Sequence, residues 1–183
     1  IMRALLMILL AGLFLAACTE EKPGYYEGDN YICFTKQGTR LYAQDTIIDL
    51  GSKSVGNETY PYSSKRIDTV YIRVRVIGEV SKAARPIKFE QYTIEGTTAV
   101  DAVPGVNYVA FDDSRVKDLM VVPADSVEVN IPIIVLFDQS SAGQYFSRVL
   151  NFRLMETDNF ELASKTYYRT PYRGKLMINQ QTN

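Results

Sequence analysis

The strictest alternation of apolar and polar side chains occupies residues 127–136. Its apolar members are Val127, Val129, Ile131, Ile133 and Val135. Because successive side chains of an extended chain point to opposite faces, these five β-branched residues form one apolar face of a strand. The opposite face begins with Glu128 and Asn130 and turns apolar at Ile134. The pattern therefore predicts a strand whose outer face is exposed at its start and covered at its end.

Other segments carry a similar signal, and turn residues separate them. The predicted strands are Tyr31–Lys36, Thr46–Leu50, Asp68–Ile77, Ile87–Ile94, Leu119–Val122, Ser147–Met155 and Gly174–Asn179. In Asp68–Ile77, Ile72 is expected inside and Tyr71 outside; in Ser147–Met155, Asn151 is expected outside. Seven or eight short strands, with no convincing amphipathic helix, predict an all-β fold, an immunoglobulin-like antiparallel β-sandwich.

Several short motifs follow one another in a set order along the chain. They are Tyr31-Ile32-Cys33-Phe34, Thr98-Ala99, Gly105-Val106-Asn107-Tyr108, Val122-Pro123-Ala124 and Ile131-Pro132-Ile133. In this order the chain resembles an uncharacterised Bacteroidetes lipoprotein family, known as domain of unknown function DUF4843, over nearly all of its mature length. The Gly-x-x-Tyr turn before a strand and hairpin also resembles Calx-β domains. That second resemblance implies an immunoglobulin-like fold only.

The N-terminus carries an unbroken apolar run, Ala4–Leu15, after Arg3. As a helix this run would reach about 18 Å at ~1.5 Å per residue, which is short of a ~30 Å hydrocarbon core. It ends in Leu15-Ala16-Ala17-Cys18, which resembles the bacterial lipobox. We therefore interpret residues 1–17 as a lipoprotein signal peptide and expect lipidation of Cys18. The alternative is an ordinary secretory leader with an incidental cysteine.

Residues 18–30 are polar and rich in turn formers, which predicts a flexible tether before a single sandwich domain, residues 31–183. Thr19 after the cysteine and the acidic pair Glu20-Glu21 favour transport to the outer membrane and its outer surface; a periplasmic location is the alternative. If Cys18 carries lipid, Cys33 has no disulfide partner and is expected to be a buried small hydrophobe.

Composition argues against several classes of function. The net charge is −1, which gives no electrostatic case for nucleic-acid binding, since that function requires a clustered basic face. The chain contains no histidine, which removes Ser-His-Asp and Cys-His nucleophiles and histidine-based zinc sites. Carboxylates, tyrosines and lysines remain for acid–base chemistry, and these need an enclosing cleft to shift their pKa values towards neutrality; a glycosidase pair of carboxylates also needs a defined separation across a cleft. We therefore expect a protein that is not an enzyme and needs no cofactor.

Two groups of loop residues are candidates for binding. Asp112, Asp113 and Asp118 form a weak calcium candidate, together with Asp138, Glu156 and Asp158; the alternative is that these are ordinary solvated turn residues. The second group could stack on or contact a ligand or partner, or could simply cap sandwich edges. It contains Tyr60, Tyr62, Tyr167, Tyr168, Arg169 and Tyr172, with Arg173 and Lys175 nearby.

Two functions from different classes fit these features. The resemblance implies a non-catalytic, surface-exposed outer-membrane lipoprotein that assists glycan or peptide capture, beside a TonB-dependent transporter and its companion lipoprotein. The alternative is a structural or adhesive surface module, which would associate through the edges of its sheets.

Overall fold

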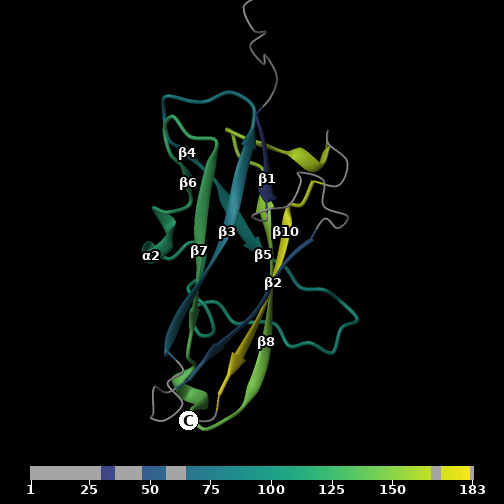
Figure 1. Cartoon of the computed structure of the whole chain (residues 1–183). Helices are drawn as coiled ribbons and strands as arrows, with labels where there is room; N and C mark the ends of the chain where they lie inside the picture. Colours follow the sequence, from purple (N-terminus) through teal and green to yellow (C-terminus); the bar gives the residue numbers. More distant parts are fainter. Residues whose placement is uncertain (1–29, 36–46, 57–64, 166–169, 182–183) are drawn as a thin grey trace, which may run out of the picture.

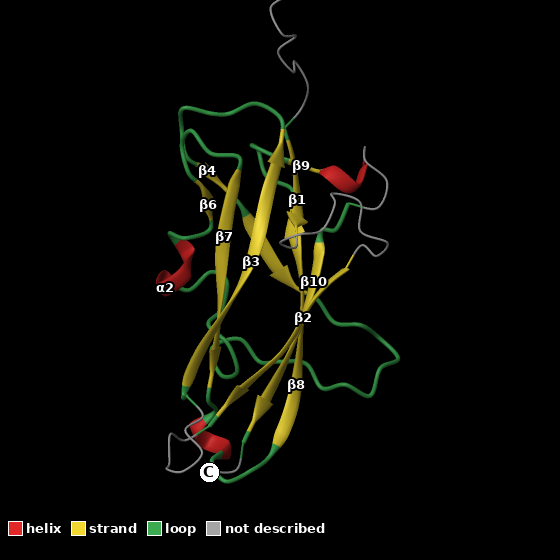
Figure 2. Cartoon of the chain, in the orientation of Figure 1, coloured by secondary structure: helices red, strands yellow, loops and turns green. Residues whose placement is uncertain are grey.

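Two four-stranded β-sheets packed face to face form the body of the protein, as the computed structural model shows for residues 30–35, 47–56, 65–165 and 170–181. Figure 1 shows β7 and β3 in one layer and β10 and β8 in the other, with their long axes roughly aligned. The few helical turns lie at the periphery (Figure 2). The predicted signal peptide, nearly all of the tether and Cys18 lie outside the described residues.

The first sheet has the strand order β7 (Glu128–Leu136), β3 (Ile67–Ile77), β1 (Tyr31–Thr35), β9 (Glu161–Leu162). The second has the order β2 (Ile47–Val55), β10 (Arg173–Gln180), β8 (Phe146–Met155), β5 (Lys88–Gln91). A small sheet pairs β4 (Arg85–Pro86) with β6 (Val121–Val122). The helical turns are α2 (Ser114–Lys117), η1 (Gln139–Ser141) and η2 (Ala163–Lys165). The predicted all-β sandwich of seven or eight strands is confirmed in its two main sheets.

Two strand pairings depart from the antiparallel arrangement that the sequence predicted. β10 pairs with β2 in parallel, from Arg173 opposite Ile47 to Gln180 opposite Val55, and β1 pairs with β9 in parallel. In both cases the chain enters the two strands from the same end of the sandwich. Such pairs join segments far apart in the sequence, so no local turn signal announces them.

The core lies between the sheets and follows the predicted alternation. On β7, Ile131, Ile133 and Val135 are at most 1% exposed, and Ile131 lies opposite Ile72 of β3. Four phenylalanine rings, those of Phe34, Phe89, Phe111 and Phe152, pack edge-to-face, tilted or stacked, with neighbouring centroids 5.4–5.9 Å apart. These aromatic contacts add to the stabilisation that burial of the rings supplies.

A smaller buried cluster contains Tyr31, Cys33 and Ala163, with Ile77 packed against it. Cys33 is fully buried, and burial raises the pKa of its thiol to about 11. The predicted role of Cys33 as a small buried hydrophobe is confirmed.

Asn151 lies on the face of β8 opposite the core residues Leu150 and Phe152, as predicted, but its side chain is buried there. The segment after β5 leaves β8 at Asn151, where the Tyr92 N–H donates to the Asn151 carbonyl. It returns at Val149, whose carbonyl accepts the Ala102 N–H. The connection therefore leaves and returns beside this part of β8.

The Gly105–Tyr108 motif forms the corner that leads towards β7. Gly105 has φ +79°, a left-handed conformation that suits glycine, and its N–H donates to the Tyr108 carbonyl. The Asn107 side-chain oxygen accepts the Val103 N–H at 2.9 Å, and the Tyr108 hydroxyl donates to Gln91 Oε1 at 2.8 Å. Burial raises the pKa of the Tyr108 hydroxyl to about 12. The motif therefore has a structural role.

Candidate functional site

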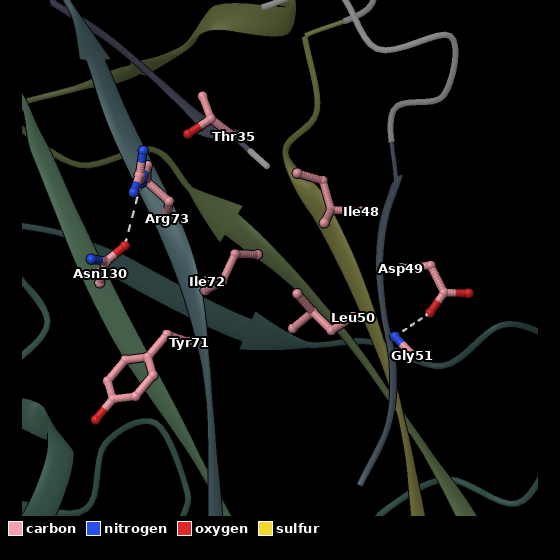
Figure 3. A pocket seen from close by; sticks show the side chains of 9 residues that line it. All are labelled: Thr35, Ile48, Asp49, Leu50, Gly51, Tyr71, Ile72, Arg73 and Asn130. Carbon is pink, nitrogen blue, oxygen red and sulfur yellow. Dashed lines mark hydrogen bonds between the residues drawn. The ribbon is translucent and has the colours of Figure 1, made fainter. Parts of the chain in front are cut away.

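A pocket of about 680 Å³ opens at the edge of the sandwich, between β2 of one sheet and β3 of the other. We call it the edge pocket (Figure 3); it is lined by Thr35, Ile48, Asp49, Leu50, Gly51, Tyr71, Ile72, Arg73 and Asn130. The last residue of β1, Thr35, lies opposite Arg73 of β3. The N-terminal half of β3, from Ile67, extends beyond this point, and the edge pocket lies there. In the described part of the chain, only β7 pairs with this half of β3.

The β2 wall of the edge pocket depends on an irregularity that the sequence did not predict. The strand predicted over Thr46–Leu50 continues further in the structure, to Val55. The pairing with β10 shifts by one residue here, because Lys175 lies opposite Asp49 whereas Met177 lies opposite Ser52. Gly51 has φ +77°, and its N–H donates to Asp49 Oδ1 at 2.7 Å. The result is a β-bulge, a feature that re-aims side chains at sheet edges.

The opposite wall combines an exposed ring with polar groups from β3 and β7. Tyr71 is 61% exposed. Arg73 Nε donates to Asn130 Oδ1 at 3.4 Å, and Arg73 Nη1 lies 3.8 Å from a Glu128 carboxylate oxygen. Arg75 holds the same carboxylate at 2.9 Å. These interactions on one sheet face hold the Arg73 guanidinium, and Figure 3 shows its hydrogen bond with Asn130.

The edge pocket therefore offers a mixed surface to a ligand. Ile48, Leu50 and Ile72 supply apolar contact, and Tyr71 supplies a ring face. Arg73, Asn130 and Asp49 supply hydrogen-bond donors and acceptors. A ligand with an apolar face and many hydroxyl groups matches this combination, since clefts of this kind use apolar walls for contact and a few polar groups for orientation.

The structure does not place most of the residues that the sequence nominated for ligand binding. Tyr60, Tyr62, Tyr167, Tyr168 and Arg169 lie outside the described residues.

Tyr172 is described, and it is half-buried and packs against the core. Its carbonyl accepts the Leu154 N–H at 2.8 Å, and the Arg173 guanidinium lies 5.4 Å from its ring centroid. Tyr172 therefore packs against the core just before β10, a central strand of its sheet.

The acidic residues nominated for calcium serve mostly as local caps and ion-pair partners. Asp113 caps α2, and hydrogen bonds from Arg115 lower the pKa of its carboxyl to about 2. Asp138 caps η1, and Glu156 lies 2.6 Å from the Lys165 ammonium. Across the described ranges, no three acidic or cysteine side chains are grouped so that they could hold a metal ion. Asp112 and Asp118 instead line a second pocket, near β5.

The residues of the edge pocket were missed as a site, although part of their signal was visible. Tyr71 was predicted to face outward, and a large aromatic residue on an outward strand face is a signal for binding. The sequence gives no sign that β2 faces this half of β3. That contact joins positions about twenty residues apart, and the sequence between them shows no regular alternation of apolar and polar residues.

The strand pairing and the edge pocket together define the class of this protein: a β-sandwich of immunoglobulin-like build with a pocket between the edges of its sheets. Within the described residues, no helix has the length and apolar character needed to cross a membrane.

Comparison with known proteins gives likenesses of fold alone. No protein-family model and no curated protein matches the chain. Among solved structures, the apo form of the Calx CBD1 domain is 15% identical, covering 84% of this chain and 99% of that one, with a TM-score of 0.44. CBD12 from CALX1.2 is 15% identical over 83% of this chain and 44% of that one, with a TM-score of 0.43.

A two-domain protein of unknown function from Bacteroides fragilis is also similar. It is 11% identical over 84% of this chain and 46% of that one, with a TM-score of 0.45. The chain thus spans just under half the length of this protein and of CBD12. At sequence identities this low, the similarity concerns the fold and says nothing about activity or ligand.

Proposed function

We propose that this chain is a non-catalytic lipoprotein, anchored in the bacterial outer membrane through Cys18 and facing the cell exterior, that assists nutrient capture. The lipobox-like Leu15-Ala16-Ala17-Cys18 and the polar tether after it support the anchor. The order of short motifs along the chain supports the finer assignment to the Bacteroidetes DUF4843 lipoprotein family. That family resemblance implies a TonB-dependent transporter and its companion lipoprotein as partners.

The edge pocket is the observation that carries the binding part of this proposal. Its exposed Tyr71 ring matches the apolar face of a sugar ring, and Arg73, Asn130 and Asp49 match its hydroxyl groups. A guanidinium is planar and presents several N–H donors in a fixed geometry, so it can hold a polar ligand in one orientation. We therefore propose glycans as the first class of nutrient to test.

Replacing Tyr71 or Arg73 should weaken glycan binding without unfolding the protein. Tyr71→Ala and Arg73→Gln are each expected to cost about 1–2 kcal/mol of binding free energy, with the melting temperature nearly unchanged. Isothermal titration against a panel of glycans measures this. Tyr145→Ala is the matched control, because Tyr145 is 67% exposed and lies outside the edge pocket. Equal weakening by Tyr145→Ala, or no binding across the panel, would contradict the proposal.

The lipid anchor has its own test. Cys18→Ala is expected to release the protein into the soluble fraction or leave it unprocessed, because the acyl chains provide the membrane attachment. Fractionation of cells and mass spectrometry of the N-terminus measure the result. Cys33→Ala serves as the control, since Cys33 is fully buried and should leave the anchor intact. Unchanged membrane partition of Cys18→Ala would falsify the lipoprotein assignment.

A structural or adhesive surface module is the second candidate, favoured by the half of β3 that pairs only with β7 among the described residues. An open strand edge can accept a strand from another chain. The genomic neighbourhood separates the two candidates: transporter genes favour nutrient capture, and pilin-like genes favour the adhesive module.

A further inference from the structure

A second pocket of about 490 Å³ lies on the open side of β5, where the segment around α2 faces it. We call it the β5 pocket; it is lined by Pro86, Ile87, Lys88, Phe89, Phe111, Asp112, Lys117, Asp118, Met120 and Val121. All of these residues belong to the described part of the chain, and none lines the edge pocket. Its volume is within the range of ligand clefts, roughly 300–1,000 Å³.

The floor of the β5 pocket is apolar and fixed in place. Ile87, Phe89 and Met120 are each 6% exposed and belong to the core. The Phe111 ring packs edge-on to Phe89 with centroids 5.4 Å apart, and Phe89 in turn stacks on Phe152 at 5.9 Å. A floor held by core packing needs little reordering when an apolar side chain binds, which favours affinity.

The backbone of β5 offers hydrogen-bonding groups on the side of this pocket. The Tyr92 N–H donates to Asn151 of β8, and backbone groups alternate along a strand, so those of Phe89 point away from β8. The Ile87 N–H, which points the same way, donates to the Met120 carbonyl at 3.0 Å. Because Met120 lines the pocket, the Phe89 N–H and carbonyl face the pocket side. In the described sheet, β5 is the last strand on this side.

The rim carries charges of both signs. Lys88, Lys117, Asp112 and Asp118 are all exposed, and none of the four forms an ion pair within the described residues. A purely anionic ligand would meet two aspartates here, and a purely cationic one would meet two lysines. A ligand with one acidic and one basic group flanking an apolar group complements the rim.

We propose that the β5 pocket docks an extended segment of a partner protein, which adds to β5 as a short strand. One residue of the segment pairs with Phe89 through both backbone groups. Its side chain then lies on the same face as the Phe89 ring, over the apolar floor, because directly opposed residues of two strands share a face. An acidic residue and a basic residue, two positions to either side of it, share that face, and the rim offers Lys117 to the acidic group and Asp112 and Asp118 to the basic one. This inference is independent of glycan binding in the edge pocket.

The test uses blocked, fluorescein-labelled pentapeptides Glu-Val-X-Val-Lys, with leucine, isoleucine, phenylalanine, methionine or serine at X, and the full chain in mild detergent. Fluorescence anisotropy is expected to show binding of at least one apolar peptide about tenfold tighter than the serine peptide. N-methylation of residue X should weaken that peptide about tenfold, because it removes the hydrogen bond to Phe89. These comparisons change the peptide only, so protein folding does not affect them.

Protein variants locate the site. Lys88→Gln combined with Lys117→Gln should weaken the best peptide about threefold or more, and should have less effect when glutamine replaces its glutamate. Lys82→Gln is the control, since Lys82 is exposed and lies outside the β5 pocket. The proposal is overturned if no apolar peptide exceeds the serine peptide, if N-methylation has no effect, or if Lys82→Gln weakens binding equally. Self-association of the chain that the lysine variants abolish would assign the pocket to a second copy and would also overturn it.

Discussion

Replacing Ile131 with aspartate is expected to lower the free energy of unfolding by at least about 3 kcal/mol, a large part of the ~5–15 kcal/mol that stabilises a domain. Ile131 is 0% exposed at the centre of β7, directly opposite Ile72 of β3. A carboxylate there would lose its hydration, and it would either stay charged without a partner or take up a proton at a raised pKa. Urea denaturation followed by circular dichroism measures the change.

Asn130→Asp is the matched control one residue along the same strand. Asn130 is exposed on the outer face, and its side-chain oxygen accepts a hydrogen bond from Arg73 that a carboxylate can also accept. The expected change is well under ~1 kcal/mol, as for most surface substitutions. If the two variants had similar denaturation midpoints, the register assigned to β7 would be wrong.

Ile131 and Asn130 lie on opposite faces of β7, and the alternation that separates them is the reason why much of the fold could be predicted from the sequence. Alternation is a local pattern, and the face it assigns to Ile131 or Ile72 depends only on which side of the strand meets the core. The buried side chains of β7, β3 and β8 therefore came out as predicted. The burial of Asn151 on the outer face of β8 was not predicted, because alternation assigns a face to a side chain but does not show whether another segment covers that face.

The candidate site was harder to predict because it depends on where strands end. The edge pocket lies where the pairing of β1 with β3 ends at Thr35 and where β2 has a bulge at Gly51. No sequence pattern predicts that a binding site forms at either feature. The parallel pairing of β2 with β10 is non-local in the same way. The tyrosines that the sequence did nominate, apart from Tyr172, lie outside the described residues, so that prediction stays open.

Replacing Gly174 should lower the free energy of unfolding nearly as much as replacing Ile131, because a local strand position here meets a ring from a distant strand. Gly174 lies directly opposite Phe152 on β8, and an added Cβ would meet the Cζ and Cε2 atoms of that ring and lie 2.8 Å from Cε1. The ring is fully buried and hemmed in by Phe34, Phe89 and Phe111. It has no room to turn aside, so the close approach requires glycine.

Gly174→Ala is therefore expected to destabilise the protein by about 2–3 kcal/mol, the upper part of the range for overpacked cores, although alanine is ordinarily the better strand residue. Lys175→Ala, at the next position of β10, should change the free energy of unfolding by less than ~1 kcal/mol. Phe152→Leu removes the ring atoms that obstruct the Cβ, so Gly174→Ala should cost clearly less in that background than in the natural chain. Equal costs in the two backgrounds would show that the Phe152 ring does not impose the glycine, and would contradict the packing described for β8 and β10.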